Sequence, residues 1–302
     1  MAQDPFDLRR HAWLDAAHVD CEIRRFLAED IGRGDVTSER VVPKAARASA
    51  EIVARQACVV AGLPLAKAVF LAIDPEIAVS DRASDGDRVR AGAVLAHIEG
   101  PAGPILTGER VALNLVQRLS GIATLTRAYA DAIEGTGASV SDTRKTTPGL
   151  RVFEKYAVHV GGGRNHRFGL YDAMLIKDNH RSIAGGAAAA VTAARQASGA
   201  AMPIQIEVDA LADLPRVLDL AVEAVLLDNM TPLQVAEAVT LVRAHPRGHH
   251  CWIEASGGIT LETIRAYADA GVDTISVGAL THSAPAVDIA LDIAAPGGAS
   301  QP

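Results

Sequence analysis

The feature that most constrains the fold is a β-then-α rhythm that begins at Ala138 and continues to Ala279. Six apolar segments of strand length alternate there with segments of helical character. Consecutive βα units predict a parallel sheet, which either closes into a barrel or stays open and doubly wound. The predicted strand segments are Ala138–Thr143, Asp172–Asp178, Ile204–Val208, Ala224–Asn229, Cys251–Gly258 and Asp273–Ala279.

The ends of these segments favour the barrel. Nearly every one finishes on a polar residue or a glycine, and a barrel collects its chemistry from many strand ends, whereas an open sheet concentrates it at one switch point. Apolar residues make up 49% of the chain and aromatic residues only 4%, which is typical of parallel sheets covered by helices. The polar ends are Asp142–Arg144, Lys177–Asp178, Glu207, Asp228, Glu254 with Ser256, and Gly278.

The sequence before Ala138 has a different pattern, which predicts an α+β domain that leads into the barrel through one long helix. The tail from Ala286 has no place in the barrel rhythm and is expected to pack on this first domain. The predicted elements are a helix over residues 19–31, a strand over Ala46–Val60, a helix over Leu65–Ile73, a hairpin over Asp85–Pro101 with turns at Gly86 and Gly92, and a helix over Thr107–Glu134 with Thr107 as its N-cap.

Charge is distributed unevenly along the chain. The formal net charge of −7 argues against a nucleic-acid partner, because such proteins neutralise phosphates with Lys and Arg. Between Thr143 and Arg167, however, six bases accompany one acid. A solvated basic helix face is one interpretation. Because Arg144 directly follows an apolar strand and Gly161–Gly163 lets backbone approach a ligand, we favour a site for a small polyanion.

Three further features stand at predicted strand ends. Glu207 and Asp228 end successive strands, where paired carboxylates serve ribose hydroxyls, Mg²⁺ or acid/base work, or form ion pairs with the basic segment. Lys177 could form a Schiff base, but its basic companions favour anion binding. The small-residue turn Ser256–Gly258, together with Gly278, is either a phosphate site or a tight turn.

The three cysteines, Cys21, Cys58 and Cys251, are far apart and odd in number, which predicts neither a disulfide framework nor a zinc site and fits a reducing cytoplasm. The first residues lack the apolar stretch of a signal peptide, and no run approaches the ~18–20 apolar residues that span a bilayer. We therefore expect a cytoplasmic protein with no membrane partner.

Eight strings of the sequence carry a family resemblance, and those that contain TRKTTPG and KDNH are long and specific. The strings are EDIGRGDVTSE (Glu29–Glu39), TGERVALN (Thr107–Asn114), DTRKTTPGLR (Asp142–Arg151), EKYAVHVGGGRNHRFGLYDAMLIKDNH (Glu154–His180), IEVDAL (Ile206–Leu211), LLDNM (Leu226–Met230), IEASGGI (Ile253–Ile259) and SVGALTHS (Ser276–Ser283). They resemble the quinolinate phosphoribosyltransferase family, with no departure at a motif position. The resemblance implies an N-terminal α/β sandwich domain over 1–117, with the tail 286–302 packed on it, and an incomplete parallel α/β barrel over 118–285. It also implies a homodimer in which Arg110 serves the neighbouring subunit's site.

The reaction implied by the resemblance joins quinolinate and 5-phosphoribosyl 1-diphosphate to give nicotinate mononucleotide, diphosphate and CO₂, with Mg²⁺. Catalytic roles would fall to Lys145, Lys177, Glu207 and Asp228, of which the two carboxylates would bind the ribose hydroxyls and the magnesium. The two lysines would neutralise the diphosphate. The remaining implied substrate contacts are Arg110, Arg144, His166, Arg167 and Lys177 for the carboxylates of quinolinate, Thr143 in the same site, and Ser256, Gly257, Gly258, Val277, Gly278 and Ala279 for the 5-phosphate.

Two alternatives stay open. One is a paralogue of the same fold that acts on another anion, as the molybdenum-associated relative of this family does. The other is a non-catalytic protein that binds a sugar phosphate or a dicarboxylate. The intact KDNH and NHRFGLYD strings favour the quinolinate enzyme.

Overall fold

The computed structural model describes residues 14–198 and 202–294 and divides into two units. The parallel-sheet unit comprises residues 126–151, 162–198 and 202–283, and the N-terminal unit comprises 14–125, 152–161 and 284–294. The change between them falls within helix α4, Ala102–Ala132, after residue 125. The division therefore differs from the expected boundary at 117/118, and it also groups residues 152–161 with the N-terminal unit.

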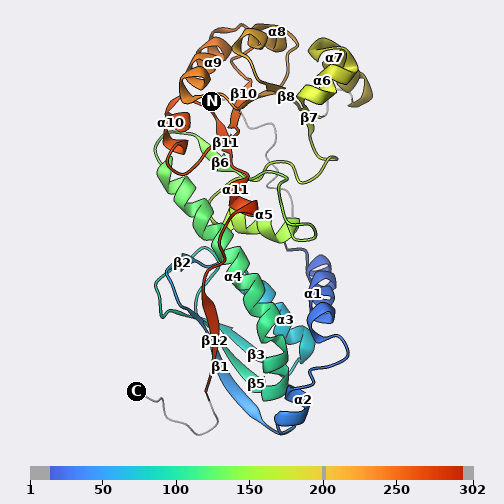
Figure 1. Ribbon diagram of the computed structural model, residues 1–302, viewed down its shortest axis with the longest axis vertical. Coiled ribbons are helices and arrows are strands. Elements are labelled where there is room, and N and C mark those ends of the chain that lie inside the picture. Colours follow the sequence, from blue (N-terminus) through green and yellow to red (C-terminus); the bar gives the residue numbers. More distant parts are fainter. Residues whose placement is uncertain (1–13, 199–201, 295–302) are drawn as a thin grey trace. The chain divides into compact units, whose positions relative to one another are not determined.

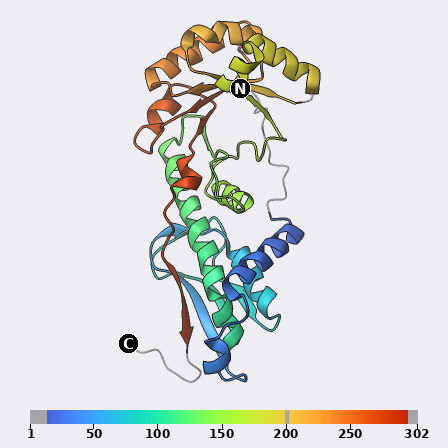
Figure 2. The same cartoon turned by 45° about the vertical axis from the view of Figure 1, so that its right-hand side comes forward.

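The parallel-sheet unit contains the six predicted strands, in the order β6-β11-β10-β9-β8-β7, and every neighbouring pair is parallel. Helices connect the strands (Figure 1, Figure 2). Among the described residues the edge strands β6 and β7 do not pair with each other, so closure into a barrel stays a prediction. The strands are β6 Ser139–Ser141, β7 Met174–Ile176, β8 Ile204–Val208, β9 Ala224–Asp228, β10 Trp252–Ser256 and β11 Thr274–Ser276. The helices are α6 Asp178–Ala184, α7 Ala187–Ser198, η1 Leu211–Asp213, α8 Leu214–Asp219, α9 Pro232–Ala244, α10 Ile264–Asp269 and α11 Ala279–His282.

The two faces of this sheet differ in chemistry. Paired residues of a parallel ladder project to the same side, and side chains alternate along each strand. One face therefore carries the buried apolar residues Ile206, Val225, Leu227, Ile253, Ala255 and Ile275. The other carries the polar residues Gln205, Glu207, Asp228, Glu254, Ser256 and Ser276.

The N-terminal unit is built on a four-stranded sheet of order β12-β1-β5-β3, with a separate β2-β4 pair. Its C-terminal strand β12 pairs antiparallel with β1. Residues after 294 lie outside the described part of the chain. The elements are α1 Ala16–Ile31, α2 Ser38–Val41, β1 Arg47–Ala54, β2 Cys58–Val59, α3 Leu63–Ile73, β3 Ala78–Asp81, β4 Arg88–Val89, β5 Val94–Pro101, α5 Arg151–Val160 and β12 Ile289–Ala294.

Two local predictions in this unit are wrong. The strands within Asp85–Pro101 do not form a hairpin, because β4 pairs with β2 while β5 pairs with β1 and β3. Thr107 is not an N-cap, because α4 begins at Ala102 and the Thr107 hydroxyl donates to the carbonyl of Gly103 one turn earlier. Across the described residues, no helix is both long enough and apolar enough to span a membrane.

Candidate active site

A cavity of about 680 Å³ is lined by residues that follow the parallel strands. All of the predicted site residues line it except Arg110 and Glu207, although Glu207 contacts the lining residue Lys177. The predicted residues that the structure brings together here are Thr143, Arg144, Lys145, His166, Arg167, Lys177, Asp228, Ser256, Gly257, Gly258, Val277, Gly278 and Ala279.

The loop after β6 is fixed by hydrogen bonds to its own carbonyls. The hydroxyl of Thr281 donates to the Lys145 carbonyl at 2.8 Å. The guanidinium of Arg151 donates to the Arg144 carbonyl at 3.4 Å and to the Phe168 carbonyl at 2.9 Å, and so joins this loop to the next. Arg144 and Lys145 are therefore held at the cavity wall by contacts that do not use their charged groups.

Two guanidinium groups of the cavity are poorly compensated. Nε of Arg144 is buried and has no hydrogen-bond partner among the described residues. Arg167 is 7% exposed, and its Nη1 donates to the Ala173 carbonyl at 3.1 Å. Burial, and then the charge of Arg144, lower the pKa of Arg167. Because buried donors are normally satisfied, the unpaired Nε of Arg144 next to a second cation favours an anionic acceptor from a ligand.

Carboxylates gather on the neighbouring strand ends. Nζ of Lys177 donates to Glu207, whose side chain is almost fully buried. Burial, and then the charge of Glu207, raise the pKa of Asp228. Glu207, Asp209 and Asp228 each offer a carboxylate oxygen, and these atoms lie within 4.8 Å of one another. Hard oxygen donors in such a cluster fit a divalent cation such as Mg²⁺.

The turn after β10 requires glycine at position 257. A Cβ there would lie 2.3 Å from Oδ1 of Asn229, and φ of Gly257 is +101°. Asn229 is itself left-handed and donates its N–H to the Ser256 carbonyl at 2.9 Å. The next helix, α10, begins only at Ile264, so this turn does not open directly into a helix and a phosphate site here would rely on loop backbone.

Of the six basic residues between Thr143 and Arg167, which we call the basic window, only three line the cavity. Arg144, Lys145 and Arg167 line it. The other three bases serve the fold: Arg151 joins two loops, Lys155 is buried on α5, and Arg164 lies over the Trp252 ring at 5.6 Å from its centroid.

Two family models match the chain. Quinolinate phosphoribosyl transferase, C-terminal domain, matches residues 122–292, which is more than half of the chain, and the N-terminal domain of the same family matches residues 35–120. The chain belongs to the quinolinate phosphoribosyltransferase family. The sequence-based assignment is thereby confirmed.

Individual relatives of this quinolinate phosphoribosyltransferase family member agree over nearly their whole length. A probable nicotinate-nucleotide pyrophosphorylase (carboxylating) from Bacillus subtilis is 42% identical, over 90% of this chain and 92% of that protein. The nicotinate-nucleotide pyrophosphorylase (carboxylating) from Mycobacterium leprae is 43% identical, over 91% and 99%. The crystal structure of NadC from Streptococcus pyogenes has a TM-score of 0.89 and 37% identity, and the match covers 94% of this chain and 99% of that one.

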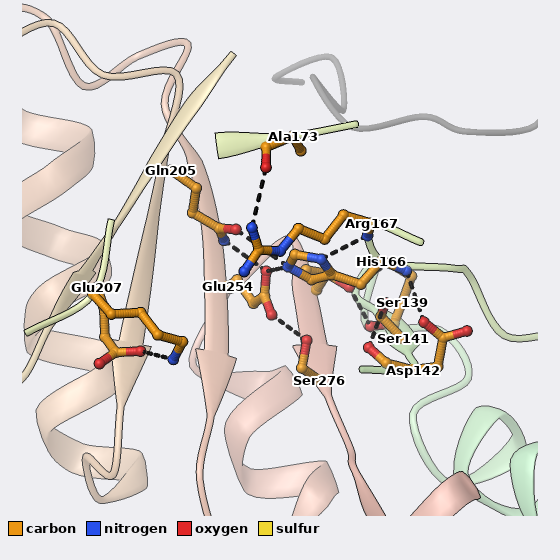
Figure 3. Close-up of polar contacts among 12 residues, drawn as sticks. Ser139, Ser141, Asp142, His166, Arg167, Ala173, Gln205, Glu207, Glu254 and Ser276 are labelled. Atoms are coloured by element: carbon orange, nitrogen blue, oxygen red, sulfur yellow. Dashed lines mark hydrogen bonds and ion pairs between the residues drawn. The ribbon is translucent and has the colours of Figure 1, made fainter. Parts of the chain in front are cut away.

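In this member of the quinolinate phosphoribosyltransferase family, polar residues to which sequence reasoning gives no role also meet at the cavity. Glu254 and Ser276 line it, and Gln205 contacts both Glu254 and His166 (Figure 3). The signal that could have found them is the alternation of polar and apolar residues within these strands, because a polar position inside a parallel strand requires a polar environment.

Arg110 of this phosphoribosyltransferase chain lies in the N-terminal unit and lines a separate hollow of about 300 Å³. Its side chain is 57% exposed, and its closest ion pair among the described residues is with Glu109, at 3.7 Å. Asp35 accepts a hydrogen bond from Thr107, one turn before Arg110, and so fixes the loop that forms the hollow.

Proposed function

We propose that the chain transfers the phosphoribosyl group of 5-phosphoribosyl 1-diphosphate to quinolinate and releases diphosphate and CO₂, giving nicotinate mononucleotide. The observation that carries this proposal is the unpaired, buried Nε of Arg144 close to the buried cation of Arg167, because an unsatisfied guanidinium donor beside a second cation favours an anionic group of a ligand. The relatives named for this reaction support it.

Quinolinate carries two carboxylates, and the cations of the cavity suit them. Arg144 and Arg167 offer planar forks that bind carboxylates bidentately, and Lys177 supplies a third charge. His166 lies beside them in the cavity wall. Arg110 of the partner subunit completes the set in our proposal.

The sugar phosphate would occupy the other side of the cavity. Asp228 and Glu207 bind the ribose hydroxyls, and the backbone of 256–258 and 277–279 holds the 5-phosphate. Lys145 and Lys177 neutralise the diphosphate that leaves. The cluster of Glu207, Asp209 and Asp228 has the donors to hold Mg²⁺, which supplies charge neutralisation to the diphosphate when bound.

Catalysis in this proposal is mainly positioning and electrostatics. As the bond from the anomeric carbon to diphosphate breaks, positive charge develops on the sugar, and the carboxylates of Glu207 and Asp228 stabilise it. The quinolinate nitrogen then bonds to the anomeric carbon and becomes positively charged. When the adjacent carboxylate leaves as CO₂, its bonding electron pair stays on the ring carbon, where the positive charge of the neighbouring nitrogen stabilises it. A proton from solvent then bonds to that carbon and replaces the carboxylate.

The experiment is direct. The chain is incubated with quinolinate, 5-phosphoribosyl 1-diphosphate and Mg²⁺, and CO₂ and nicotinate mononucleotide are followed. Product that depends on both substrates supports the proposal. Turnover of a different aromatic acid with none of quinolinate would identify the paralogous function, and binding of both ligands without turnover would identify a binding protein.

We also propose a homodimer in the reducing cytoplasm, where its three cysteines stay free thiols, as they are in the structure. If Arg110 acts across the dimer, inactive Arg110→Ala and Lys177→Ala subunits should recover activity when mixed, because each hybrid dimer holds one intact site. No recovery despite demonstrated subunit exchange would place Arg110 in its own subunit's site or outside any site.

A further inference from the structure

A polar network lies in the wall of the cavity next to Arg167 (Figure 3). Its centre is the carboxylate of Glu254, which is 2% exposed. Ser276 donates its hydroxyl to Oε1, and the Gln205 amide donates to Oε2 at 2.7 Å. Nε2 of His166 lies 3.3 Å from the same Oε2 and 3.2 Å from Oε1 of Gln205. Three side chains from three separate segments thus converge on one buried carboxylate.

The acceptor role of Glu254 sets the orientation of the Gln205 amide and the position of the proton on the His166 ring. Oε1 accepts the Ser276 hydroxyl, and Oε2 faces the Gln205 amide and the His166 ring, both of which can donate, so Glu254 acts here as an acceptor. The Gln205 group that faces it must therefore be the NH₂, which leaves the amide oxygen facing His166. Nε2 of His166 then meets two acceptors, and only a protonated Nε2 satisfies both.

The other nitrogen of the ring is also engaged. Nδ1 of His166 accepts the backbone N–H of Arg167 at 2.7 Å, so it carries no proton and the imidazole is neutral. The backbone N–H of His166 is held in turn by Asp142, at 2.9 Å. The His166 ring therefore links the backbone N–H of Arg167 to Glu254 and Gln205.

We propose that Glu254 is a positioning residue that fixes His166 as the neutral Nε2–H tautomer and, through it, the backbone from which Arg167 reaches quinolinate. The inference rests on the proposed function for the identity of that ligand. It also changes the expected role of His166, because both ring nitrogens are used within the protein. His166 then orients Arg167 and donates no hydrogen bond to a quinolinate carboxylate.

The tautomer is measurable on the full chain labelled with ¹⁵N-histidine. Protonated and unprotonated ring nitrogens give separate signals, and couplings to the ring protons distinguish Nδ1 from Nε2. The chain has ten histidines, so the spectrum of His166→Gln identifies the signals of His166. We expect a protonated Nε2 and a bare Nδ1 in the unliganded chain. A proton on Nδ1 overturns the proposal, whether or not the chain is active.

Glu254→Gln removes the charge and keeps the size of the side chain. We expect His166 to lose its single tautomer and the KM for quinolinate to rise about tenfold, the effect of one weakened charge-assisted hydrogen bond, with the KM for 5-phosphoribosyl 1-diphosphate unchanged. The matched control is Glu154→Gln. Glu154 is also fully buried and pairs with Arg118 at 2.9 Å in the N-terminal unit, so its loss should affect stability alone.

A Glu254→Gln chain that is less stable but keeps both the tautomer and the KM for quinolinate, as the control does, would show a merely structural role and overturn the proposal. If Glu254→Gln does not fold, Ser276→Ala removes one donor to the carboxylate and should raise the KM for quinolinate by less than about tenfold. An unchanged KM for quinolinate would then overturn the proposal. A chain with the expected tautomer but no turnover of quinolinate contradicts the proposed function and leaves the tautomer assignment standing.

Discussion

Charged residues at the amino ends of the parallel strands form ion pairs within the protein, whereas several at the carboxyl ends lack a full set of partners. At the amino ends of the strands, two arginines each pair with a carboxylate. Arg195 donates to Glu223 at 2.7 Å, and Arg243 donates to Asp273 at 2.7 Å. After the strands, Arg144 has a buried donor without a partner among the described residues. The pKa values of Arg167 and Asp228 are there shifted toward their neutral forms, mainly by burial.

This difference separates the charged residues that stabilise the fold from those that are available to a ligand. At the amino ends the carboxylates also accept backbone N–H groups that begin strands, Glu223 from Ile204 and Asp273 from Ile253. Such closed networks stabilise the native state without a ligand. At the carboxyl ends Lys177 pairs with Glu207, but Arg144 and Arg167 are two cations held close together, and we infer that a ligand compensates them, as parallel α/β folds place their sites at these ends.

The largest effect that would sharpen this comparison is expected at Lys177. Lys177→Ala should lower kcat by about 100–1000-fold, because one preorganised charge next to the leaving diphosphate is lost. Arg195→Ala at the amino ends is the control and should keep kcat while lowering Tm. Initial rates at saturating substrates and thermal unfolding measure both. A kcat for Lys177→Ala close to that of the parent chain would remove Lys177 from the chemistry.

A smaller and more selective effect is expected at Arg144. Arg144→Ala should raise the KM for quinolinate by about 10–100-fold, the loss of charge-assisted hydrogen bonds, with little change in Tm because no partner within the described chain is lost. Steady-state kinetics and thermal unfolding test this. A large drop in Tm with unchanged affinity would instead mean that Arg144 supports the fold.

The strand pattern was predictable because parallel strands, buried on both faces, leave strong apolar segments with polar ends. β8 has the predicted bounds, and the other five strands lie within theirs. Strand partners were not predictable: the turn glycines near Asp85–Pro101 mark a reversal, but they do not encode that β5 pairs with β1. The start of α4 was missed because Pro104 reads as a helix breaker, although proline is tolerated in a first turn.

The site was predictable where charge follows a strand directly, as at Arg144 and Lys177. It was not predictable where a role depends on a partner from another strand. Glu254 stands at a strand end in the sequence, but nothing there indicates that Gln205 and Ser276 donate to it. The sequence also overestimated the number of basic residues in the site, because Arg164 and Lys155 of the basic window serve the fold instead.

At the amino ends, Asp273→Asn should lower stability and spare activity. The substitution keeps an acceptor for Ile253 but removes the charge that faces Arg243, which is expected to cost about 1–3 kcal/mol. The Tm should fall by several degrees, while kcat and both KM values stay those of the parent chain. An unchanged Tm would show that the closed network at this end contributes no stability.

Asp228→Asn should do the reverse in metal-free buffer, and by the smallest amount. The pKa of Asp228 is raised in the folded chain, first by burial and then by Glu207, so above that pKa its ionisation opposes folding. The amide cannot ionise, and the variant should therefore melt higher at neutral pH, by less than about 4 °C. The gain should shrink as the pH falls through the raised pKa and vanish below the ordinary value of 3.8, where Asp228 is protonated in both states. The same variant should lose activity. Tm measured across this range with chelator present tests the sign: a lower Tm at neutral pH would mean that Asp228 is compensated like Asp273, and the contrast between the two ends would fail at this residue.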